Sequence, residues 1–423
     1  MVARDGSARA ILSNRSVAAI LGATGLSFTA SLIQAIALGK FVFDLTGRAL
    51  DLGLLGLAEF VPTALLVLVT GSVADRFDRR IVGALALTGE ASAAAALAVY
   101  AASKPTAVWP VFLIVIGFGA ARGFAAPAVR SIPAMVAPEG TLARVVAFNS
   151  GAWQLATIVG PVIGGLLYTV RPWVPFAAAA LVFLLAITAL TAVRLGPAPD
   201  GPRDRPTVSH ALEGLRFIRR TPLLLAAISL DLFAVLFGGA VALLPALAKD
   251  RLGVGAVGLG WLRAAGGIGA SVTAAALAAR PLRRRIGRWL LVAVGVFGVA
   301  TVVLGVTRSY VVAFVAMGVL TAADMVSVFV RGTIVPLATP DDMRGRVLAV
   351  EQVFIGASNE LGAFESGVAA AVIGLVAAVM TGGLATLVVV AVWWRVFPAL
   401  RDADTFDDVT RAAPRAPATP PVG

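Results

Sequence analysis

The sequence predicts an all-α polytopic membrane protein built from two similar six-helix bundles. Its 423 residues are 59% hydrophobic and 14% charged, and the mean hydropathy of +0.92 lies well outside the range of soluble globular proteins. About twelve apolar runs are each long enough to cross a bilayer, which takes about 20 residues. One segment of the chain also has a second, similar copy about 200 residues later, which indicates a duplicated half.

The expected transmembrane helices follow one another with short polar turns between them. The first follows a polar start without a small-residue cleavage site, so we expect a retained helix and not a signal peptide. In chain order the twelve expected spans are 17–42, 50–74, 81–101, 107–130, 144–169, 174–194, 222–247, 256–279, 289–307, 310–337, 347–373 and 375–396.

The duplication relates residues 136–150 to residues 338–352. At a constant offset of 202 the matching pairs are Pro138 and Pro340, Arg144 and Arg346, Val145 and Val347, Ala147 and Ala349, Gly160 and Gly362, and Gly165 and Gly367. At an offset of 205, Gly53, Arg79 and Arg80 match Gly258, Arg284 and Arg285. Coincidence between two arginine-tipped loops is the alternative, but the matching glycines continue into the next helix. Parallel halves of this size are typical of transporters.

The distribution of basic residues sets the expected orientation. Most of the 35 Lys and Arg fall on the side of the membrane that both termini share, so we expect both termini in the cytoplasm. The net charge of +12 therefore indicates contact with anionic membrane lipids and no nucleic acid partner. The chain has no cysteine, which excludes disulfides and thiolate metal sites.

These patterns divide the chain into four parts. We expect an N-terminal six-helix bundle at 1–194, a cytoplasmic linker at 195–221 and a C-terminal six-helix bundle at 222–396. The linker opens with a Pro- and Gly-rich stretch and closes with an amphipathic stretch, which predicts a short helix on the membrane surface. The polar, Pro-rich tail at 397–423 is expected to be disordered.

Two motifs lie beside expected helices of the first bundle. The turn after the second span contains Gly71, Asp75, Arg76, Arg79 and Arg80, and the fifth span contains Gly160, Pro161, Gly164 and Gly165. Glycines allow helices to pack closely, and a proline inside a membrane helix frees backbone carbonyls and bends the helix.

The first motif resembles the cytoplasmic signature of the major facilitator superfamily, and the second resembles the antiporter motif of that superfamily. The segments 37–62, 230–265, 323–347 and 354–367 are similar to the branch that contains the enterobactin exporter and macrolide-efflux-like permeases. The resemblance implies two bundles around a central cavity lined by helices 1, 4, 7 and 10, and export of small amphipathic molecules. Arg122 is followed by Gly-Phe-Ala where drug antiporters have Gln-Gly, so proton coupling does not carry over directly.

Charged residues inside the spans are costly and normally face a partner or a wet cavity. Position 122 plus the offset of 202 is 324, so Arg122 in one half corresponds to Asp324 in the other. We expect these two side chains to meet across the cavity and to exchange partners when substrate or a proton binds. The alternative is that each pairs within its own half. The full set is Glu59, Glu90, Arg122, Asp231, Arg263, Asp324, Glu351, Glu360 and Glu365.

Two carboxylates are candidates for the proton site. Asp231 lies nine residues into the seventh span, and Glu59 of the second span is its rival. The alternative for either is that it supports a local arginine or hydroxyl. At the cytoplasmic turn we expect Asp75 to meet the start of helix 11 near Arg346 when that side is shut, and a solvated turn aspartate is the alternative.

Two aromatic side chains are candidates for substrate contact. Trp153 lies inside the fifth span and Phe233 inside the seventh. Stacking against a substrate is one interpretation of these positions, and packing against lipid or other helices is the alternative.

No feature of the sequence supports an enzyme. It contains no Walker loop and no HExxH motif, and we expect no cofactor and no metal. The sequence predicts a monomeric secondary active transporter of the bacterial inner membrane that exports small amphipathic, siderophore- or drug-like molecules, with proton antiport as its coupling. Proton-coupled uptake, or a receptor or scaffold of the same fold, are the alternatives.

Overall fold

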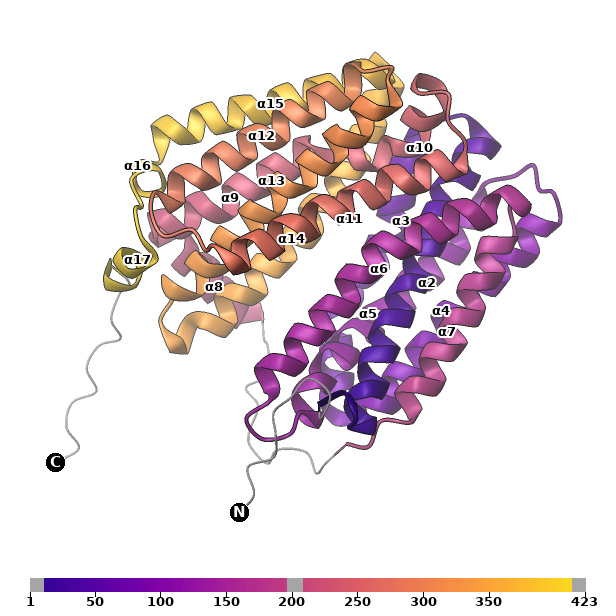
Figure 1. The fold of residues 1–423 in the computed structure, drawn as a ribbon, viewed down its shortest axis with the longest axis horizontal. Helices are drawn as coiled ribbons and strands as arrows, with labels where there is room; N and C mark the ends of the chain where they lie inside the picture. Colours follow the sequence, from indigo (N-terminus) through magenta and orange to yellow (C-terminus); the bar gives the residue numbers. More distant parts are fainter. Residues whose placement is uncertain (1–10, 196–207, 413–423) are drawn as a thin grey trace. The chain divides into compact units, whose positions relative to one another are not determined.

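The computed structural model describes residues 11–195 and 208–412, and in these residues the structure is all-α (Figure 1). The chain packs as two compact units: unit 1 is Met1–Asp204 with Ala242–Gly267, and unit 2 is Arg205–Val241 with Ile268–Gly423. Ten helices of the described part are long and apolar enough to cross a membrane. Of the other expected spans, α5 (Trp109–Val136) has only a shorter apolar part and α14 (Asp341–Ile373) is rich in charge, so the count of twelve stays a prediction.

The first 195 residues form most of unit 1. Its helices are α2 (Arg15–Thr46), α3 (Ala49–Arg76), α4 (Arg79–Ala102), α5, α6 (Leu142–Val170) and α7 (Val174–Thr191). The α2 helix packs against α6 and α7, while α5 packs between α3 and α4. The sequence sets the ends of α2, because Asn14 accepts hydrogen bonds from two N–H groups of the first turn and Gly47 follows the last turn with φ +64°.

A segment from the second half of the chain also belongs to unit 1. It comprises α10 (Leu244–Ala246), the π-helix η2 (Leu247–Arg251) and the first half of α11 (Ala256–Ala279). Lys249 Nζ lies 3.2 Å from Asp44 Oδ1, and Gln154 Nε2 donates to Gly267 O at 3.2 Å. This differs from the expected boundaries, which placed all of 222–396 in one bundle, because sequence order alone does not show these long-range contacts.

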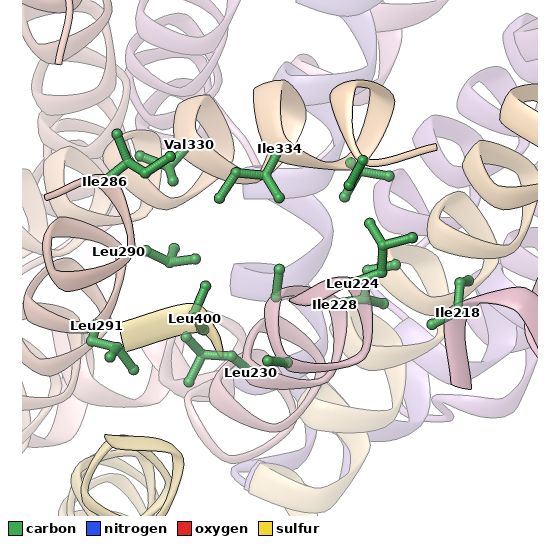
Figure 2. Close-up of a cluster of buried hydrophobic side chains, with 14 of the residues drawn as sticks. Ile218, Leu224, Ile228, Leu230, Ile286, Leu290, Leu291, Val330, Ile334 and Leu400 are labelled. Carbon is green, nitrogen blue, oxygen red and sulfur yellow. The ribbon is translucent and has the colours of Figure 1, made fainter. Parts of the chain in front are cut away.

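Unit 2 contains the remaining helices. They are α8 (Val208–Arg220), α9 (Pro222–Phe237), the rest of α11, α12 (Ile286–Val306), α13 (Tyr310–Leu337), α14, α15 (Leu375–Val396), α16 (Pro398–Arg401) and α17 (Phe406–Ala412). The α12 helix packs against α13 and α15, and α9 packs against α14 and α15. Aliphatic side chains of α9, α12, α13 and α16 form its buried core (Figure 2).

The linker and the tail bear on two expectations. The expected amphipathic helix corresponds to α8, which packs against α14, whereas residues 196–207 lie outside the described part of the chain. The tail differs from the expected disorder, because α16 and α17 are helical and Leu400 and Val409 are buried. Apolar residues between the polar ones allow this packing. Residues 413–423 lie outside the described part.

Candidate functional site

The interior of unit 2 holds an arginine between carboxylates from two other helices. The Nη1 atom of Arg331 on α13 lies 2.7 Å from Oδ2 of Asp231 on α9 and 3.7 Å from Oε1 of Glu351 on α14. The three residues are only 4%, 6% and 5% exposed, respectively. A charge at this depth is tolerated only when it is paired. This ion-pair network therefore links α9, α13 and α14.

A small cavity lies beside this network. It is lined by Asp231 and Asp324, by Ser327 and by apolar side chains that include Phe297. Asp324 precedes Arg331 by two turns on the same helix face. Among the described residues, the buried Ser327 Oγ and Arg331 Nε have no hydrogen-bond partner. The cavity has a volume of about 10 Å³, which fits one water molecule, so it is a candidate water site beside the ion-pair network of unit 2.

Unit 1 has a smaller charged cluster. Arg122 Nη1 on α5 lies 3.1 Å from Glu59 Oε1 on α3, and these side chains are 39% and 31% exposed. Glu90 on α4 is buried and interacts electrostatically with both. The helices approach closely here, because Thr63 Oγ1 donates to Gly119 O at 2.7 Å. Arg122 thus has a partner inside unit 1, and its exchange with Asp324 stays a prediction.

The turn between α3 and α4 is fixed by its own side chains. Asp78 is the N-cap of α4 and accepts a hydrogen bond from Arg80 N at 2.8 Å, while Arg80 Nη2 lies 2.8 Å from Asp78 Oδ2. These contacts with Arg80 lower the pKa of Asp78. Arg80 Nη1 also donates to Val193 O at 2.9 Å, which ties the turn to the end of α7. Arg79 Nη1 contacts Met135 Sδ at 3.8 Å.

The other predicted gate residues are only partly described. Arg76 is exposed at the end of α3, whereas the side-chain environments of Gly71 and Asp75 lie outside the described part of the structure. Arg346 at the start of α14 forms an ion pair with Glu213 of α8, with Nη1 and Oε2 2.6 Å apart. The meeting of Asp75 with Arg346 therefore stays a prediction, and Glu213 is a partner that the sequence did not indicate.

The glycines of the fifth-span motif lie at close helix contacts. A Cβ atom placed on Gly160 would lie 2.7 Å from Leu32 Cβ, and one on Gly164 would lie 2.8 Å from Ile33 O, so both glycines pack against α2. Gly165 packs against the backbone of α11, and the carbonyl oxygen of Pro161 also lies against α11. Each of these four motif residues is buried, including Pro161 inside α6. The motif therefore joins α6 to α2 and to the first half of α11.

The two aromatic candidates are half-exposed but packed. The ring centroid of Trp153 is 5.1 Å from that of Phe28 on α2. Phe233 lies 5.5 Å from Trp393 and 6.3 Å from Phe237. Both side chains are more than a third exposed, so packing and substrate contact are compatible. Their contact with substrate stays a prediction.

The sequence did not indicate Arg331 as a site residue. This arginine lies near the end of its expected span, where an arginine is usual, so it does not stand out from the other basic residues. The useful signal was its spacing from Asp324, seven residues earlier on the same helix face. Glu351 stands out as a charge within an apolar stretch, but only the packing of α14 against α13 makes it a partner of Arg331.

The fold is similar to those of solved transporter structures. It is similar to a POT family transporter in complex with 5-aminolevulinic acid, with a TM-score of 0.73, 10% identity, and coverage of 92% of this chain and 97% of that one. It is also similar to the nucleoside transporter NupG (D323A mutant), with a TM-score of 0.70, 10% identity and coverage of 90% and 99%. At these identities the similarity shows the fold alone.

The family follows from the sequence of the whole chain. A model described as transmembrane secretion effector matches residues 6–419, and the chain belongs to this family of the major facilitator superfamily. The multidrug efflux pump Tap of Mycolicibacterium fortuitum is 29% identical over 88% of this chain and 93% of its own length. The enterobactin exporter EntS of Escherichia coli is 28% identical over 72% and 70%. The protein is thus a membrane transporter of a family with efflux-pump members.

Proposed function

We propose that the protein is a secondary active exporter of small amphipathic molecules, drug-like or siderophore-like, that works by alternating access and proton antiport. We place it in the bacterial inner membrane as a single chain with both termini in the cytoplasm. The efflux pumps and the siderophore exporter among its relatives support the direction and the class of substrate. The observation that carries the proposal is the excess of buried acid around Arg331.

The charges of this cluster favour a proton as the coupling ion. Asp231, Asp324 and Glu351 would together hold three negative charges, whereas Arg331 supplies one positive charge. Asp231 and Glu351 are buried and Asp324 is half-buried, so at least one negative charge in the apolar interior would be uncompensated. Such a charge is costly, so at least one carboxyl group holds a proton. Protonation and release at Asp231 would change its attraction to Arg331. The packing of α9 against α14 and α13 would then depend on the proton.

A proton-flux measurement tests this coupling. We expect purified protein in liposomes containing a pH-sensitive dye to move protons against ethidium or erythromycin, and Asp231→Asn to lose transport driven by a pH gradient. The variant should retain substrate exchange without a gradient, because the carboxylate is needed for coupling and not for binding. Asp342→Asn on the exposed start of α14 is the matched control. Unchanged proton flux in Asp231→Asn would exclude Asp231 as the coupling site. If protons and substrate instead move in the same direction in the wild type, uptake would be favoured over export.

Charge exchange distinguishes the two possible partners of Arg122. If Glu59 is the working partner, Arg122→Glu and Glu59→Arg should each lose transport, and the double variant should recover part of it. If Arg122 instead pairs with Asp324 during transport, recovery should appear in the double variant Arg122→Asp with Asp324→Arg. Initial efflux rates in liposomes provide the measurement. Recovery in neither double variant would argue against direct pairing as the requirement for transport.

A further inference from the structure

The segment after the last long helix is packed into unit 2. Leu400 of α16 is fully buried among side chains of α9 and α12, and Figure 2 shows it beside Leu290, Leu291 and Leu230. Phe406 of α17 meets Phe329 of α13 edge to face at 6.3 Å. These contacts hold residues 398–412 against the ends of α12 and α13.

This segment supplies the hydrogen-bond acceptors for the start of α12. The N-cap residue Arg285 has φ +56°, and its side chain makes no capping hydrogen bond. Instead, Arg285 N donates to Asp404 Oδ1 at 2.9 Å and Ile286 N to Asp404 O at 3.2 Å. Gly287 N donates to Ala403 O at 3.1 Å. Three N–H groups that a helix start leaves unsatisfied are thus bound by the tail.

The carboxylate of Asp404 also binds the side chain before the cap. Arg284 Nε and Nη2 donate to Asp404 Oδ2 at 3.2 and 3.1 Å. The hydrogen bond from Arg285 N and the contact with Arg284 lower the pKa of Asp404. The backbones of α12 and the tail approach closely at Gly287, because a Cβ atom there would collide with Leu400 O.

In the first half of the chain, a side chain of the turn itself caps the helix that follows the turn. Asp78 caps α4, and Arg80 ties that turn to Val193 just after the last helix of the first six. In the second half, the residue that aligns with Asp78 at the offset of 205 is Arg283. Residues 280–288 contain no Asp or Glu, so that turn has no carboxylate of its own. In both halves the turn is bound to the chain that follows the sixth helix.

We propose that Asp404 is a positioning residue for transport, which caps α12 from the tail and replaces the carboxylate that the second copy of the turn lacks. This inference rests on the proposed transport function. A capped turn keeps the cytoplasmic ends of α12 and α13 together with the tail as one body. Alternating access moves bundles largely as rigid bodies, so a frayed end of α12 slows the conformational step and leaves substrate affinity unchanged.

Hydrogen exchange and transport test the cap together. In Asp404→Ala we expect the amides of residues 285–287 to exchange faster by about fivefold, the size typical for loss of an N-cap. The maximal rate of ethidium efflux in liposomes should fall by a similar factor, about fivefold, with an unchanged apparent KM. Asp407→Ala, which removes an exposed acid from the same tail, should match the wild type in both. Unchanged exchange in Asp404→Ala overturns the cap.

A relocated carboxylate separates positioning from general stability. In the Asp404→Ala background, Arg285→Asp places an acceptor at the N-cap of α12 itself, whereas Arg283→Asp makes the same charge change two residues earlier. Recovery of the efflux rate by Arg285→Asp alone supports the proposal. Recovery by both variants or by neither overturns it. If the wild-type protein exports none of ethidium, erythromycin and a catecholate siderophore, the proposed function is overturned instead. The cap is still tested in that case, because hydrogen exchange measures it without transport.

Discussion

Replacing Arg331 with methionine should abolish transport and lower the free energy of unfolding by about 3–5 kcal/mol. The change leaves Asp231 and Glu351 buried without the cation that lies 2.7 and 3.7 Å away. A neutral side chain of similar length fills the space, so the loss measures the charge and not a cavity. Thermal unfolding of the detergent-solubilised protein and efflux from liposomes provide the two measurements.

Two further variants define what Arg331 does. Arg308→Met removes an exposed arginine just before α13 and should leave both stability and transport unchanged. Adding Asp231→Asn to Arg331→Met should recover much of the stability, because it removes one unpaired charge, but it should not recover proton-driven transport. An Arg331→Met protein as stable as the wild type would show that the carboxylates are already neutral or otherwise compensated.

The sequence could predict the acids of this site better than the arginine. Asp231 and Asp324 stand out because a carboxylate inside an apolar run is rare and costly. Arg331 does not stand out, because arginines are common near the cytoplasmic ends of spans. Its role depends on the packing of α13 beside α9 and α14, which hydropathy does not describe. Periodicity within one helix cannot identify a partner on another.

The repeat had a similar limit at the turns before α4 and α12. It paired Arg79 and Arg80 with Arg284 and Arg285; the first pair begins α4, and the second pair directly precedes α12. It did not indicate that the acid of the second turn comes from Asp404, 119 residues after Arg285. The polar composition of the tail predicts disorder, whereas a few apolar residues such as Leu400 are enough to hold it in place.

The close contact of Gly165 with α11 in unit 1 leads to the other large expected effect. Gly165→Ala should strongly reduce transport, because its Cβ atom would collide with Ala256 O and lie 3.2 Å from Gly260 Cα. Both obstacles are backbone atoms, so the helices must separate. Overpacking of this kind costs about 1–3 kcal/mol. Gly151→Ala on the same helix is the matched control, because a Cβ atom there has no neighbour within 4 Å.

A cross-link can show whether Gly165→Ala loosens the packing of the segment 242–267 in unit 1. The chain has no cysteine, so Asp44→Cys with Lys249→Cys gives a single pair of thiols for a short bifunctional thiol reagent, at a place where Lys249 Nζ and Asp44 Oδ1 lie 3.2 Å apart. Both Gly165 and Lys249 hold the segment 242–267 in unit 1. Gly165→Ala should therefore lower the yield of this cross-link by about fivefold, the population shift that about 1 kcal/mol produces. An unchanged yield together with lost transport would place the effect of Gly165 in the substrate path and not in the packing of this segment.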